Sequence, residues 1–395
     1  MNPLVLCIPL IASFIGWFTN WLAVKAMLYP VEPVGRGPFA WQGVIPANAE
    51  NLCLNFSQLI HEKLLDIEQI FSEISHDDSE EVKRVVEEVS QEIVHEFSTN
   101  LAPESWARAR EKLRGYINDL VRRNVRTVTD EILQRMSREA SDFIDVDEIV
   151  RQAMVDDRAL LGRVMIEVAG PEFKFIERSG LWFGALFGVV QMLVWIAYPA
   201  GWVLPAAGFF VGYVTNWLAM TLIFEPKEPK RVGPFRVQGV FIKRQFEVAR
   251  KFADVIADRV LTGDNMIKHL TEGPSREPVM AILEEQVEAS MKEYERDAMV
   301  AMLVSKEKLE EAKEDLMGRV RSTDLAQSGP IHAFADQSER IRAQMEANLR
   351  TLDPGEFSGV LRPVFQKDEW KLVVAGGVIG AIIGAVQVVT LFGGF

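Results

Sequence analysis

The stretch FIGWFTNWLAVKAMLYPVEPVGRGPFAWQGV, from Phe14 to Val44, occurs a second time as FVGYVTNWLAMTLIFEPKEPKRVGPFRVQGV, from Phe210 to Val240. The copies align without a gap at an offset of 196 residues and are identical at 16 of 31 positions. Agreement of this length indicates an internal duplication. A chain of 395 residues in which a unit recurs after half its length is expected to hold two equivalent units.

Apolar residues gather in four stretches, even though the mean hydropathy is only +0.06. Each stretch has about 20 residues, enough for a helix to cross a hydrocarbon core about 30 Å thick. The sequence therefore predicts an all-α, four-span helical membrane protein with two parallel internal repeats, each with a large cytoplasmic insert. The expected boundaries are transmembrane helices at 1–28, 179–203, 205–224 and 371–395, and inserts at 29–178 and 225–370.

Basic residues flank the four stretches on one side only. No Lys or Arg occurs in the first 24 residues, between 181 and 224, or after Lys371. Because basic flanks stay inside, the inserts are predicted to be cytoplasmic and both termini to lie outside. The first span lacks the basic start and the cleavage site of a signal peptide, so it is expected to remain as an anchor. The net charge of −13 argues against a general nucleic-acid binder.

The first and third spans each carry a stripe of small and polar residues at helical spacing. Such stripes let helix backbones approach closely and put side-chain amides on the contact face. They include Gly16, Thr19 and Asn20 in the first span and Gly212, Thr215 and Asn216 in the third. An amide at membrane depth is costly without a partner, so both asparagines are candidates for a bond across a helix interface or for a pore, ion or lipid contact.

The second and fourth spans carry a glycine at every fourth position. This extended face of small residues predicts tight helix pairing. A glutamine follows in each span and could join the asparagines in a polar cluster. The glycines are Gly180, Gly184 and Gly188 in the second span and Gly376, Gly380 and Gly384 in the fourth, and the glutamines are Gln191 and Gln387.

After the first and third spans, prolines stop the helix and a loop follows at the membrane surface. Gln42 and Gln238 in these loops are candidate ligand contacts, although the loops equally serve to fix the angle at which each insert leaves the bilayer. The second copy adds a basic cluster that suits anionic lipid headgroups, and positive-inside topology explains part of it. The candidate contacts are Arg231, Arg236, Lys243, Arg244, Arg250 and Lys251.

The inserts show apolar residues at spacings of three and four between charged ones, which predicts amphipathic helices. One is expected over Ser79 to Ser98, a longer one from Pro103 to about Ile144, and another from Val279 onward. No strand is predicted. Because these apolar faces must be buried against each other or against another subunit, the inserts are expected to form helical bundles or coiled-coil-like stalks.

Residues for catalysis or metal binding do not stand out. The five histidines have no paired ligand spacing, and neither a His-Glu-x-x-His motif nor a cysteine cluster occurs. A nucleophile elbow and a lysine-bearing phosphate loop are also absent from the sequence. The sequence therefore predicts no catalytic residue, no metal and no cofactor, and the protein is expected not to be an enzyme.

The motifs together resemble a known family. Both copies contain Gly-x-x-Thr-Asn-x-x-Ala, Pro-x-x-Pro and Gly-Pro-Phe-x-x-Gln-Gly, and Glu167-Val168-Ala169-Gly170-x-Glu172 leads into the span that contains Gln191. This pattern is similar to the bacterial membrane-protein family known as domain of unknown function 445. The resemblance implies a multi-pass protein of the bacterial cytoplasmic (inner) membrane and supplies no catalytic residue. The family's Pro-Lys-Arg type segment is divided here, with Pro46 in one copy and Lys243-Arg244 in the other.

The leading functional hypothesis is a non-enzymatic membrane-anchored scaffold or tether, expected to be oligomeric, whose inserts bind a cytoplasmic protein or one another. The alternative is transport of a lipid, ion or small solute along a pathway at the repeat or subunit interface, lined by the intramembrane amides. A third hypothesis, an enzyme acting on lipid headgroups, rests only on the basic second loop. The expected partners are membrane lipids, including anionic headgroups, and further copies of the chain.

Overall fold

A computed structural model describes the chain apart from residues 1–2, 36–39, 73–79, 158, 323–336, 367–368 and 394–395. The chain divides into two compact units. Unit 1 comprises Met1–Leu64, Val150–Ile256 and Ala343–Phe395, and unit 2 comprises Leu65–Ile149 and Ala257–Arg342. Almost every described element is a helix, so the all-α prediction is confirmed.

Unit 1 contains four helices that are long and apolar enough to cross a membrane. They are α1 (Ile8–Leu28, preceded by a 3-10 turn at Pro3–Cys7), α10 (Leu160–Ala197), α11 (Val203–Phe224) and α21 (Glu369–Phe392). Three of them start close to the predicted spans. The fourth, α10, begins 19 residues before residue 179, because its apolar residues continue on one side with no helix break and Pro171 is accommodated inside it.

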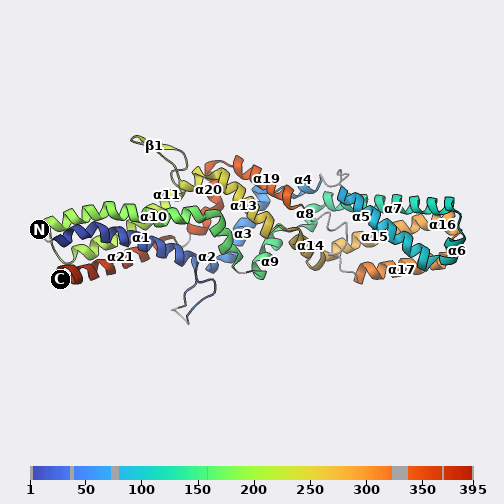
Figure 1. The fold of residues 1–395 in the computed structure, drawn as a ribbon, viewed down its shortest axis with the longest axis horizontal. Coiled ribbons are helices and arrows are strands. Elements are labelled where there is room, and N and C mark those ends of the chain that lie inside the picture. Colours follow the sequence, from blue (N-terminus) through green and yellow to red (C-terminus); the bar gives the residue numbers. More distant parts are fainter. Residues whose placement is uncertain are drawn as a thin grey trace. The chain divides into compact units, whose positions relative to one another are not determined.

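The four helices form a bundle of two pairs, α1 with α10 and α11 with α21 (Figure 1). One end of the bundle holds a buried cluster made of Val5, Ile8, Trp195, Leu204 and Val388. The starts of α1 and α11 and the ends of α10 and α21 therefore meet there, so α1 and α11 run in one direction and α10 and α21 in the other.

The opposite end of the bundle continues into short helices of unit 1. These are α2 (Val44–Ala47), α3 (Ala49–Leu59), a π-helical turn (Ile60–Leu64), α12 (Val240–Lys243), α13 (Gln245–Arg259), α19 (Ser338–Thr351) and α20 (Pro354–Gln366). Their core is aromatic: Phe241 stacks on Phe357 with ring centroids 4.6 Å apart, and Phe56 contacts Phe252. Burying rings of this size supplies much of the packing energy of this layer.

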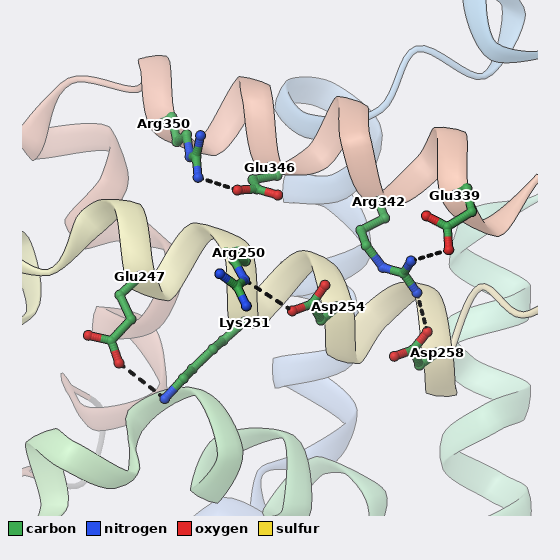
Figure 2. A network of polar contacts seen from close by, with 9 residues as sticks. All are labelled: Glu247, Arg250, Lys251, Asp254, Asp258, Glu339, Arg342, Glu346 and Arg350. Carbon is green, nitrogen blue, oxygen red and sulfur yellow. Dashed lines mark hydrogen bonds and ion pairs between the residues drawn. The ribbon is translucent and has the colours of Figure 1, made fainter.

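Polar contacts also tie α13 to α19. The amide of Gln245 donates to the carbonyl oxygens of Leu349 and Leu352 at 2.9 and 2.8 Å. Figure 2 shows pairs along each helix, including Lys251 with Glu247 and Arg350 with Glu346. These exposed pairs one helical turn apart support the helices by a few tenths of a kcal/mol each, about 0.3–0.5 kcal/mol.

One strand pair occurs, contrary to the prediction of no strand. β1 (Lys230–Val232) pairs antiparallel with β2 (Phe235–Val237). The turn between them contains Gly233 at a φ of +60°, a conformation that favours glycine. In the first copy the corresponding loop has only an isolated bridge between Val34 and Trp41, and its Gly37-Pro38-Phe39 motif lies outside the described residues.

Unit 2 consists of amphipathic helices packed on one another. They include α4 (Ile67–Ser72), α5 (Glu80–Glu96), a π-helical turn (Phe97–Leu101), α6 (Pro103–Arg108), α7 (Glu111–Arg138), α8 (Ala140–Phe143), α9 (Val146–Asp156, whose start belongs to unit 2), α14 (Gly263–Glu272), α15 (Arg276–Arg296), α16 (Ala298–Ala301) and α17 (Lys306–Ser322). The pairs α5 with α7 and α15 with α17 pack along their lengths. Helices of the two inserts also contact each other, α7 with α15 and α16, so the described helices of both inserts contribute to one compact unit.

The helix predicted from Pro103 to about Ile144 is broken into α6, α7 and α8. Ala109 and Arg110 are extended, with ψ angles of 134° and 153°. The guanidinium of Arg114 donates to the carbonyl of Trp106 at 2.8 Å and to that of Ala107 at 3.0 Å. These bonds satisfy the carbonyls left open where α6 ends, which explains why the chain can turn here without a glycine or proline.

His269 connects the segment after α8 to the turn between α14 and α15 in unit 2. Its Nε2 lies 3.1 Å from the Ser275 hydroxyl and accepts from the Asp145 backbone N–H at 3.4 Å, while Ser275 donates to the carbonyl of Phe143 at 2.7 Å. Only 7% of His269 is exposed, and burial lowers the pKa of its imidazole despite the nearby carboxylates of Asp145 and Glu148. The folded protein therefore favours the neutral form of the His269 imidazole.

We expect unit 2 to lose stability as the pH falls below about 6.5, the pKa of an unfolded histidine. Between that value and the lower folded pKa, the unfolded chain binds more protons than the folded one, so the free energy of unfolding rises with pH there. Urea unfolding of the whole protein at pH 5 and pH 7.5 measures this, and His269→Gln should flatten the dependence. An equal pH dependence in wild type and variant would show that another group is responsible.

Candidate functional site in the membrane helices

The asparagines of the repeated stretch join the two helices of each pair. The side-chain amide of Asn20 donates to the carbonyl oxygen of Ile176 at 2.6 Å, and that of Asn216 donates to the carbonyl of Leu372 at 2.9 Å. Both side chains are buried, with 0% and 3% exposed. The helix-interface role, one of the two predicted for these residues, is therefore present at equivalent positions of both copies.

The neighbouring threonines bond within their own helix. Thr19 donates to the carbonyl of Ile15 at 2.9 Å, and Thr215 donates to that of Val211 at 2.8 Å. The amide oxygens of Asn20 and Asn216 have no partner in the described part of the chain. The void beside Asn216 has a volume of only about 10 Å³ and is otherwise lined by apolar residues, so it has no room for a solute.

Glycines allow the backbones to approach where the asparagines bond. A Cβ added to Gly180 would overlap the carbonyl oxygen of Gly16 and lie 2.7 Å from the Asn20 amide nitrogen. In the other pair, a Cβ on Gly376 would overlap the amide of Asn216. The remaining predicted packing glycines also meet backbone or side-chain atoms of the facing helix: Gly16, Gly184, Gly188, Gly212, Gly380 and Gly384.

The glutamines do not join the asparagines. Gln191 lies 15 residues beyond Ile176 in α10, which is about 22 Å at a rise of about 1.5 Å per residue, and Gln387 lies equally far beyond Leu372 in α21. The predicted polar cluster is therefore not formed. Gln191 and Gln387 are both buried, the oxygen of Gln191 has no described partner, and neither polar atom of the Gln387 amide has one.

The loop glutamines close their own loops. Gln42 donates to the carbonyl of Val31 at 2.8 Å, and Gln238 donates to the equivalent carbonyl of Lys227 at 3.1 Å. The backbone N–H of Gly43 and that of Gly239 bond back to Pro30 and Pro226 in the same way. These contacts match the predicted role of fixing the angle at which the chain leaves the membrane helix.

The basic residues of the second loop divide into two groups. Arg231 and Arg236 are directly opposite each other in the β1–β2 register and exposed, as is Lys243 on α12. Like charges at opposing positions repel, and they share one face of the hairpin. Arg244 instead bonds to Glu172 at 2.5 Å and to Glu247 at 2.6 Å.

Arg244 and Lys251 both pair with Glu247, whereas Arg250 forms a separate, exposed pair. Glu172 is 1% exposed, so its charge is compensated by Arg244 rather than by water. Lys251 bonds to Glu247 at 3.2 Å and Arg250 lies 3.9 Å from Asp254 (Figure 2). The hydrogen bonds from the cationic side chains of Arg244, the main cause, and Lys251 lower the pKa of the Glu247 carboxyl to about 2. The sequence singled out Arg244 but gave no signal that Glu172 would be its partner.

Among the described residues, one serine–histidine contact resembles part of a catalytic site. Ser275 and His269 meet in unit 2, but Ser275 is 5% exposed and its hydroxyl donates to a backbone carbonyl, so a substrate has no access to it. Among the described residues, no group of three or more His, Cys, Asp or Glu side chains could hold a metal ion.

The fold and these contacts define an α-helical membrane protein in which polar residues fasten helix to helix. No protein-family model matches the chain, and no solved structure does. It is similar to a UPF0754 membrane protein of Staphylococcus epidermidis, with 30% identity over 83 residues, 20% of this chain and 22% of that protein. A UPF0754 membrane protein of Staphylococcus aureus is 28% identical over 112 residues, 28% of this chain and 27% of that protein.

The chain thus matches about a quarter of the length of these curated relatives. Their names describe them as membrane proteins and give no activity. The similarity accordingly supports the membrane class of this chain.

We expect Gly180→Ala to destabilise the α1–α10 pair by about 1–3 kcal/mol, the usual cost of overpacking. Gly170→Ala on the same helix is the matched control, because a Cβ there meets nothing within 4 Å. The control should be neutral or stabilising by up to about 1 kcal/mol, since alanine favours helix over glycine. Unfolding of the two variants by a denaturing detergent compares them, and equal midpoints would show that the close approach at Gly180 does not limit stability.

Proposed function

We propose that this protein is a non-enzymatic scaffold or tether anchored in the bacterial cytoplasmic membrane, with its helical inserts in the cytoplasm. The observation that carries the proposal is the use of the intramembrane asparagines. Their amides bond to a carbonyl of the paired helix, and the void beside Asn216 is about 10 Å³. A bundle built in this way suits an anchor, because polar groups that bond from helix to helix hold the helices together.

The charge distribution supports the orientation and the lipid contact in this proposal. The basic residues Arg231, Arg236 and Lys243 follow α11 directly and are exposed, as expected of a segment next to anionic headgroups. Tyr29 and Trp41 are also about half exposed near the same end of α1, where amphipathic rings favour the membrane interface. The motif resemblance to domain of unknown function 445 fits the same location.

Unit 2 supports the tether role through an exposed methionine pair. Met299 and Met302, at the α16 turn, are 41% and 72% exposed. The turn lies beside the start of α7, where Tyr116 donates to Asp297 at 2.6 Å. Methionine is common at surfaces that bind other proteins, because its side chain adapts to different shapes. We propose this turn as the contact with a second copy of the chain.

The test is the particle mass and a short-range cross-link. In lipid nanodiscs, native mass spectrometry should give multiples of the 44.5 kDa chain. With Cys7 and Cys53 replaced by alanine, Met302→Cys should cross-link two chains with a short bis-maleimide, because each chain presents the same turn. Asp264→Cys, exposed on α14, is the control and should remain uncross-linked. A single-chain mass together with no cross-link at Met302 would refute the proposal.

Transport remains the second candidate because of one observation. The buried amide of Gln387 has neither polar atom paired among the described residues, an arrangement that is costly inside a membrane unless a water or solute bonds to it. The amide of Gln387 in α21 could therefore bond to a solute that crosses the membrane along this helix.

Replacing both Asn20 and Asn216 by leucine, and separately Gln387 by leucine, distinguishes the two candidates. For an anchor, the double asparagine variant should lose about 0.6–1.7 kcal/mol of stability per lost bond, and neither variant should change ion or lipid flux in liposomes. For a transporter, Gln387→Leu should abolish flux while leaving stability intact. Absence of protein-dependent flux in the wild type would exclude transport.

A further inference from the structure

We propose that the cavity between α1 and α21 binds one acyl chain of an anionic membrane phospholipid, with the headgroup at Lys371. This inference goes beyond the scaffold role and rests only on the membrane location of the four helices. The cavity has a volume of about 420 Å³, within the range of about 300–1,000 Å³ usual for ligand sites.

The walls of the cavity are apolar and small. Leu22, Ala23 and Ala26 come from α1, and Leu372, Ala375 and Ile379 come from α21. Away from Trp41 and Lys371, the polar side chains of the wall already have partners, since Thr19 donates to Ile15 and Gln42 donates to Val31. The remaining lining residues are apolar or glycine, which suits an apolar occupant.

The position and charge of the rim indicate a phospholipid. The cavity lies at the end of α1 that leads into the surface loop, and Lys371, near the start of α21, lines it. Trp41 lines it too and is 49% exposed. A lysine and a tryptophan at the interface suit a phosphate group and the glycerol region, and each basic charge near the surface raises the affinity for anionic lipid by roughly fivefold.

The second copy shows why the space exists. At an offset of 196, Ala26 corresponds to Leu222, and Ala47, which also lines the cavity, corresponds to Lys243. Two positions that carry long side chains in the second copy thus carry only a methyl group here. The small residues of the first copy therefore add room to the cavity between α1 and α21.

The residue at the equivalent position of the second copy suggests a test variant. Ala26→Leu places in the first copy the side chain that the second copy already carries, so the helix should tolerate it. Ala375→Leu fills the same space from the opposite wall, and Val378→Leu, on the exposed side of α21, is the matched control. Thermal unfolding of each variant in detergent verifies the fold.

The probe is phosphatidylglycerol with a photoreactive diazirine in one acyl chain, in vesicles of phosphatidylethanolamine and phosphatidylglycerol. We expect labelled peptides from residues 19–26 and 371–379 in the wild type and in Val378→Leu. Losing contact with about two methylenes should lower this labelling roughly 15-fold in Ala26→Leu and Ala375→Leu. Lys371→Gln should lower labelling by phosphatidylglycerol relative to that by phosphatidylethanolamine carrying the same chain.

Unchanged labelling in the two filled variants would overturn the inference, as would no labelling of these peptides in the wild type. Labelling that fell equally for both lipids in Lys371→Gln would overturn the headgroup assignment. Cross-links from these peptides to a second chain would also overturn it, because a helix of another copy would then occupy the cavity. The scaffold proposal is tested by particle mass, which the filled variants should leave unchanged.

Discussion

The close approach of helix backbones at glycine, locked by an asparagine amide, is the constraint on which the membrane unit depends. Lipid tails are as apolar as the helices, so the hydrophobic effect gives little drive for association. Contact must come from packing and from hydrogen bonds. Gly16 and Gly180 bring α1 and α10 together, and Asn20 bonds to Ile176 across the gap. The α11–α21 pair repeats this arrangement with Asn216 and Leu372.

The same arrangement orders the chain beyond the membrane. Because α10 continues toward its start without a break, it presents Glu172 to Arg244, which lies at the junction of α12 and α13. The stack of Phe241 on Phe357 secures the other side of this layer. In the first copy, Asn48 occupies the position of Arg244, and its side-chain amide donates to the carbonyl of Val44. The two copies thus share their membrane contacts and differ in how the juxtamembrane layer is held.

Differences between the copies are where specific function is concentrated. Arg231 and Arg236 face each other in the second loop where the first copy has Gly35 and Ala40. Ala26 opens space in the first copy where the second has Leu222. The second loop therefore adds exposed positive charge at these two positions, and Ala26 of the first copy adds room to the apolar cavity between α1 and α21. The two helix pairs, although similar in their membrane contacts, thus present unlike surfaces.

The sequence by itself determined the helical class, the four spans, the glycine faces and the interface role open to the asparagines, because helical period and residue size are local properties. It could not predict that Gln191 and Gln387 would lie about 22 Å from the asparagines' contacts, which depends on helix direction and a rise of about 1.5 Å per residue. The sequence also did not predict the helix break at Arg110 or the hairpin that turns at Gly233. Only the tertiary structure decided that Glu172 would meet Arg244 and that a cavity would open between α1 and α21, since both join residues far apart in the chain.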